Sequence, residues 1–151
     1  MAEIFVDEGL DYMLNTLFRG GTVDTTLFVG LFTSQTATTV PARTATGGTS
    51  PSGWTEMTAS SGTYARIAIA TGDWASPATN GNGRRIALSS PKTFTGFVSS
   101  APANGFFIAT NSSSSSGDVI ICFANFDSGT ARSLATTSDE LRITPRIQFD
   151  G

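Results

Sequence analysis

The chain has 151 residues and a mass of 15.7 kDa, with 39% hydrophobic residues, 14% charged residues and a formal net charge of −3. This length supports one hydrophobic core, and the apolar content is too high for an intrinsically disordered chain. The sequence contains no histidine, which excludes the commonest general base, the most frequent zinc ligand and the histidine-containing catalytic triads. Nine basic residues and a pI near 4.7 disfavour nucleic-acid binding.

The remaining composition bears on cellular location. The single cysteine, Cys122, cannot form an intrachain disulfide, and no apolar stretch approaches the ~18 residues that span a membrane. The first residues, MAEIFVDEG, are acidic where a secretory signal is basic. We therefore expect a protein that stays in the cytosol or is assembled there into a larger particle, with neither a membrane nor nucleic acid as partner.

The first predicted element is an α-helix over about residues 7–19. Five large apolar residues recur at the spacing of one helical face: Leu10, Met13, Leu14, Leu17 and Phe18. Acidic residues precede this run, where the helix dipole favours negative charge, and Gly20 and Gly21 follow it as a stop signal. The sequence therefore predicts one amphipathic N-terminal helix.

Two roles are open for the apolar face of this helix. It can pack on the sheet of its own domain, or it can insert into a neighbouring protein as an anchor. We expect the first, because only three residues separate Gly21 from the next strand at Thr25, a connection too short to let the helix travel far. The same five residues are the first candidates for a partner interface.

Strand patterns begin at residue 25. Residues 25–32 are apolar on both alternating faces, which predicts a strand covered on both sides. Residues 34–53 are polar and contain two prolines, which indicates a long surface loop. Further strands are expected at 64–70, 84–88, 92–98, 105–110, 118–126 and 141–149.

These elements predict a mainly β fold: a single domain over residues 1–151, built as an antiparallel β-sandwich or a jelly-roll-like barrel with one N-terminal helix. Pro145 predicts that the last strand is an edge strand. An exposed edge needs a cover, so Ile147 and Phe149 in this strand are further candidates for the partner interface.

The best enzymatic arrangement is a pair of carboxylates, as glycosidases use. The available residues are Asp73, Asp127, Asp139 and Glu140. They stand beside Gly, Ser and Thr, the usual neighbours in turns, so we interpret them and Asp118 as solvated turn residues. Cys122 lies in an apolar strand and is expected to be a packed, inert thiol. The sequence thus predicts neither a catalytic centre nor a cofactor or metal site.

Two further patterns have a functional and a structural interpretation. Residues 80–85, NGNGRR, offer glycines and arginines to an anion, but no strand-to-helix transition follows, so a turn is expected. Tyr12, Trp54, Tyr64 and Trp74 can stack on sugars, but aromatic residues are common in sandwich cores, and we favour the core.

Several segments in order carry a resemblance to a known group of proteins. They are LDYMLNTLFRGG at 10–21, TLFVGLFTS at 26–34, GTYARIAI at 62–69, KTF at 92–94, NGFFIAT at 104–110, SGDVI at 116–120 and LRITP at 141–145. In these segments the chain resembles small virion proteins of tailed bacteriophages that are catalogued as tail fibre proteins and related to capsid cement proteins.

The resemblance implies a structural role in the virion, without catalytic residues. A single β domain of this size is too compact to form a fibre by itself and lacks heptads or collagen-like triplets. We therefore expect a cement or decoration protein that binds the major capsid protein, with a tail fibre or baseplate component as the alternative and a carbohydrate-binding module third. We also expect a homo-oligomer, most simply a trimer on a symmetric site.

Overall fold

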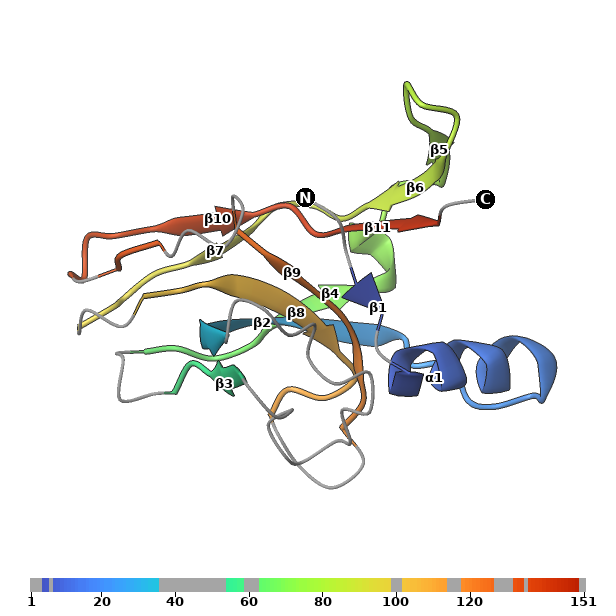
Figure 1. Cartoon of the computed structure of the whole chain (residues 1–151), viewed down its shortest axis with the longest axis horizontal. Coiled ribbons are helices and arrows are strands. Elements are labelled where there is room, and N and C mark those ends of the chain that lie inside the picture. Colours follow the sequence, from blue (N-terminus) through green and yellow to red (C-terminus); the bar gives the residue numbers. More distant parts are fainter. Residues whose placement is uncertain are drawn as a thin grey trace.

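The computed structural model describes residues 4–5, 7–35, 54–58, 63–98, 102–113, 118–126, 132–134 and 136–149. Their strands form two layers, and the helix lies at one end (Figure 1). The fold is therefore mainly β and antiparallel with one N-terminal helix, as predicted. The predicted loop at 34–53 lies outside the described residues, except that the preceding strand continues to Gln35.

Helix α1 spans Asp7–Phe18, close to the predicted bounds. The amides of Arg19 and Gly21 both donate to the Asn15 carbonyl, and Gly20 has a φ of 71°. This left-handed residue ends the helix at the position that the glycine pair predicts.

The larger sheet contains β1 (Ile4–Phe5), β9 (Ile120–Asn125), β8 (Gly105–Ala109), β2 (Thr26–Gln35) and β3 (Trp54–Glu56), in that order. Strand β4 (Ile67–Ala70) also pairs with β2, beyond β3 along the same edge. All these pairings are antiparallel, and β2 is the strand that brings distant parts of the chain together.

The second layer is made of two small sheets placed end to end (Figure 1). One contains β5 (Ala78–Thr79), β6 (Arg85–Leu88) and β11 (Arg146–Phe149); the other contains β7 (Lys92–Phe94) and β10 (Leu141–Ile143). A 3₁₀ turn, Thr71–Asp73, connects the layers. The last predicted strand is divided at the buried Pro145, whose carbonyl accepts from Ser89, and both halves lie at sheet edges.

The main core lies between the layers. It includes Val29 and Leu31 from β2, Ile69 from β4, Phe106 from β8 and Phe94 from β7. The opposite face of β2 is also covered, because Phe32 is only 1% exposed, so the prediction of a strand covered on both sides is confirmed. Among the described strands all three sheets are open rather than closed, which favours the sandwich over the barrel.

Candidate interaction surface

One side of α1 packs on the larger sheet, and small or polar residues make that contact. Gly9 is buried against Ile121 of β9, so closely that a Cβ atom there would collide with the Ile121 backbone. Tyr12 packs on the cluster of Ile108, Ile121 and Cys122. Its hydroxyl accepts from the Asp24 amide at 2.9 Å, and burial raises its pKa. A glycine inside a helix lowers the stability of the helix. The close approach to β9 explains why a glycine stands at position 9.

The apolar side of α1 faces outward. Leu14, Leu17 and Phe18 are 54%, 73% and 78% exposed, and Val23 in the following segment is 63% exposed. Only Leu10 and Met13 of the predicted face are half-buried. The expectation that this face packs in the domain's own core is therefore wrong for Leu14, Leu17 and Phe18, which we call the outward face.

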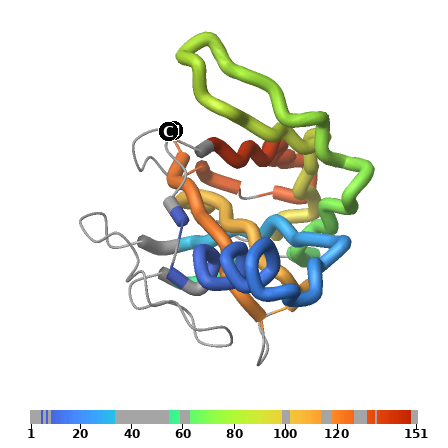
Figure 2. The backbone as a smooth tube through the Cα atoms, turned by 90° about the vertical axis from the view of Figure 1, so that its right-hand side faces the viewer, coloured from blue at the N-terminus to red at the C-terminus, as the bar shows by residue number. Residues whose placement is uncertain are grey.

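The error has a physical cause. The short connection to β2 fixes where α1 lies, but it does not fix the rotation of the helix about its axis. That rotation is set by Gly9, because only its side of the helix can approach β9 so closely. The second half of α1 extends beyond the strands (Figure 1), and viewed from that end it covers one side of the layers (Figure 2).

The second predicted interface segment lies at an edge of the second layer. Strand β11 pairs through Arg146–Phe149 with β6, and no strand of the described residues pairs with its other side. Ile147 is half-buried against the cluster of Ile108, Ile121 and Cys122. The Phe149 backbone is opposite Arg85, and its side chain lies outside the described part of the chain.

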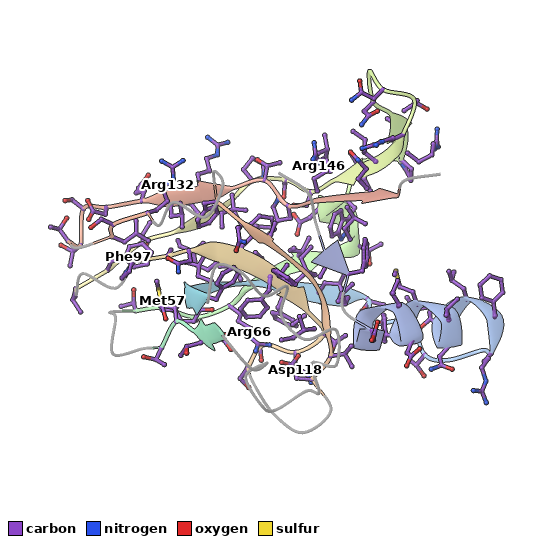
Figure 3. The ribbon with its side chains drawn as sticks, viewed as in Figure 1. Met57, Arg66, Phe97, Asp118, Arg132 and Arg146 are labelled. Atoms are coloured by element: carbon purple, nitrogen blue, oxygen red, sulfur yellow. The ribbon has the colours of Figure 1, made fainter. Side chains whose placement is uncertain are left out.

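A buried ion cluster is the strongest electrostatic feature. Arg66 donates from Nε and Nη2 to the two Glu56 carboxylate oxygens and from Nη1 to Asp118 Oδ2, each at 2.8 Å. Nη1 also donates to the Asn111 carbonyl, and the guanidinium lies 4.9 Å from the centre of the Phe107 ring. The Arg66 and Asp118 side chains are each 2% exposed. Figure 3 shows both beneath the larger sheet.

We call Arg66, Glu56 and Asp118 the Arg66 cluster. Burial alone would lower the pKa of Arg66, but the hydrogen bonds and charges of Glu56 and Asp118 raise it above its ordinary value. Burial and the Glu56 charge raise the pKa of Tyr64, whose hydroxyl bridges Glu56 and the Leu31 amide. The groups satisfy one another, so the cluster joins β3, β4 and the β8–β9 hairpin instead of presenting a reactive group.

The predicted carboxylates have different environments. Asp118 is buried, so its interpretation as a solvated turn residue is wrong: its partner Arg66 is distant in sequence. Asp73 binds Lys92 at 2.8 Å and Ser90, and its hydrogen bonds with Lys92, Ser90 and the Ala70 amide lower its pKa to about 2. Asp139 accepts from the Thr136 amide, as in a turn, and Glu140 is exposed. Asp127 lies outside the described residues.

The remaining candidates have structural roles. Residues 80–83 form the expected turn: Asn80 Oδ1 accepts from the amides of Asn82 and Arg84, and Gly83 has a φ of 79°. Cys122 is buried in β9, as expected. Tyr64 and Trp74 pack against the main core, and the Trp54 side chain is outside the described set.

The described residues contain no group of three or more potential metal ligands, and none of their helices has the length and hydropathy of a membrane span. Comparison with protein-family models, curated protein sequences and solved structures finds no match. Among the described residues, the outward face is the candidate interaction surface with the largest exposed apolar side chains.

Proposed function

We propose that this protein is a structural component of a tailed-bacteriophage virion, a cement or decoration protein that binds and stabilises the major capsid lattice. The observation that carries the proposal is the outward face. A large exposed apolar surface is typical of a protein–protein contact. The sequence resemblance supplies the virion context, and the inward use of Tyr64 and Trp74 gives no support to sugar binding.

The outward face supports binding through apolar burial. Leu14, Leu17 and Phe18 together expose roughly 400 Å², within the range of the largest apolar patches on monomers, which are often functional. Only 14% of the residues are charged, so binding should depend little on salt. A protein that binds only the assembled shell stabilises it by mass action, since disassembly must first release the bound copies.

The packed sandwich supports the same role. The Arg66 cluster and the main core join its strands, while the second half of α1 extends beyond the ends of the strands. A contact on a rigid element loses less conformational entropy on binding than one on a loop.

Electron microscopy of intact particles tests the proposal. We expect density for this domain on the capsid surface, at a symmetric position between major capsid subunits, with α1 in an intermolecular contact. Density in the tail would replace the cement role with the fibre or baseplate alternative. Particles without the protein would overturn the virion role altogether.

A further inference from the structure

The sequence contains three pairs in which glycine follows asparagine, at residues 80–81, 82–83 and 104–105. Asparagine is among the chemically labile residues, and its lability is greatest before glycine. The backbone nitrogen of the glycine can attack Cγ of the asparagine, because glycine has no Cβ atom to obstruct the approach. The attack requires the side-chain amide and the next peptide group to turn toward each other, so the fold decides which pairs can react.

The pair at 104–105 is fixed in the larger sheet. The Asn104 amide donates to the Phe32 carbonyl at 2.8 Å, and the Asn104 carbonyl accepts from the Phe126 amide at 2.9 Å. Gly105 is buried in β8, where a Cβ atom would collide with the Ala124 carbonyl and the Phe32 ring. Attack by the Gly105 nitrogen therefore requires the sheet to open locally.

The pair at 80–81 is restrained by hydrogen bonds of its own side chain. Asn80 Oδ1 accepts from the amides of Asn82 and Arg84, each at 3.0 Å, and Asn80 Nδ2 donates to Gln148 Oε1 of β11 at 3.1 Å. Attack by the Gly81 nitrogen moves both side-chain atoms away from these partners. All three hydrogen bonds must break, so this pair is protected although it lies in a turn.

The pair at 82–83 is the least restrained. Asn82 and Gly83 are exposed at the end of the turn between β5 and β6, which projects from the second layer (Figure 1). Among the described residues, none forms a hydrogen bond with the Asn82 side chain. Apart from its chain neighbours, no atom of the described residues lies within 4 Å of a Cβ built on Gly83. The Gly83 amide donates to the Asn80 carbonyl at 3.0 Å, and only this bond has to open.

We propose that Asn82 is a site of spontaneous deamidation and that the fold confines the reaction to it. The Gly83 nitrogen loses its proton to hydroxide and forms a bond with Asn82 Cγ. The bond between Cγ and Nδ2 then breaks, and Nδ2 leaves as ammonia with a proton from water. A water molecule opens the resulting succinimide ring at either carbonyl, which gives aspartate or isoaspartate. The net reaction consumes one water and releases one ammonia.

The product differs from the original chain in charge and in backbone. A carboxylate replaces a neutral amide two residues before Arg84, which adds one negative charge to a formal net charge of −3. Isoaspartate also places an additional CH₂ group in the main chain of the turn. Asn82 belongs neither to the main core nor to the outward face, so the domain should stay folded, and the inference does not rest on the proposed function.

Mass spectrometry of the full-length protein tests the proposal. The protein is kept in mildly alkaline buffer and digested with trypsin, and fragmentation of the peptide 67–84 separates Asn80 from Asn82. We expect Asn82 to convert at least tenfold faster than Asn80 or Asn104. The same protein unfolded in denaturant is the control. Its three pairs should react at similar rates, because each asparagine precedes glycine and the fold no longer distinguishes them.

A substitution checks the assignment. Asn82→Ser should remove the main product and keep the unfolding temperature of the wild type, whereas Asn15→Ser, at another exposed asparagine, should leave the product unchanged. Equal conversion of Asn80 and Asn82 in the folded protein, or faster conversion of Asn104, would overturn the proposal. So would an unmodified Asn82 under conditions that convert it in the unfolded chain. None of these outcomes involves particle binding, so the proposed function is tested separately.

Discussion

The Arg66 cluster and the outward face of α1 depart from the usual distribution of residues in opposite directions. The cluster places a guanidinium and two carboxylates in or near the interior, with Arg66 and Asp118 side chains each 2% exposed. The outward face places Leu17 and Phe18 in solvent, 73% and 78% exposed. Buried charge and exposed apolar surface are both informative, because both are costly.

The two regions differ in whether the chain itself supplies contacts that compensate for the unfavourable burial or exposure. Every charged group of the Arg66 cluster has a partner at hydrogen-bond distance, so the cluster is explained by folding alone. The outward face is not covered by the described residues. Contact with another molecule would remove this apolar surface from water, and for this reason we propose that the interaction surface lies there.

Breaking the Arg66 cluster should have the largest effect. Arg66→Met leaves the Glu56 and Asp118 carboxylates without their cation, and we expect the free energy of unfolding to fall by about 3–5 kcal/mol. Denaturant unfolding measures the change. Arg85→Met, at an exposed arginine that bonds Thr79 and the Pro77 carbonyl, should change it by under ~1 kcal/mol. Equal effects of the two substitutions would show that the cluster is not a special contact.

Adding a side chain at the close contact between α1 and β9 should have the next largest effect on stability. Gly9→Ala raises helix propensity by about 1 kcal/mol, yet its methyl group collides with the Ile121 backbone. We expect a net loss of about 1–3 kcal/mol in thermal or denaturant unfolding. Asn15→Ala, on the exposed side of the same helix, should be neutral or slightly stabilising. A stabilised Gly9→Ala protein would contradict the observed rotation of α1.

Protonation of Asp73 in acid should lower the stability by a smaller amount. The folded state lowers the pKa of Asp73 from 3.8 to about 2, so the contribution of this carboxylate to the free energy of unfolding is complete above about pH 4. It is lost as the pH falls toward 2. Between pH 4 and 2 the thermal midpoint of the wild type should fall more steeply than that of Asp73→Asn. Glu140→Gln, at an exposed carboxylate, should follow the wild type. Parallel curves for wild type and Asp73→Asn would refute this.

Polar substitution of the outward face should have the smallest effect on stability. Leu17→Ser with Phe18→Ser removes side chains that contact mainly solvent, so the unfolding free energy should change by no more than ~1 kcal/mol. A loss of several kcal/mol, as large as that of Arg66→Met, would show that Leu17 and Phe18 are part of the core. It would contradict the difference between the two regions.

The sequence predicts local structure better than the environment of each side chain. The bounds of α1 follow from apolar spacing and from Gly20, because both act within a few residues. The short β1, β3 and β5 were not predicted, since two or three residues are too few to show alternation. An apolar helical stripe predicts only that something covers it, and gives no information about which molecule does so.

The Arg66 cluster shows the same limit. Alternation with Ile67 and Ile69 places Arg66 on the other face of its strand, which in an ordinary sandwich is solvated. Burial of that face depends on the pairing of β4 with β2, and the partner Asp118 is 52 residues away.

For the rotation of α1, one local signal is present in the sequence. Gly9 inside a predicted helix indicates a close approach on its side of the helix, and so identifies the side that packs.

The most direct test of the central claim is the affinity of the protein for virus particles that lack it, measured by co-sedimentation for the wild type and for Leu17→Ser with Phe18→Ser. Asp7→Asn with Asn15→Ser, on the same helix but outside the outward face, is the matched control. We expect the double serine variant to unfold at the wild-type temperature and to bind at least tenfold more weakly, while the control binds normally. Wild-type affinity of the folded double serine variant would contradict it.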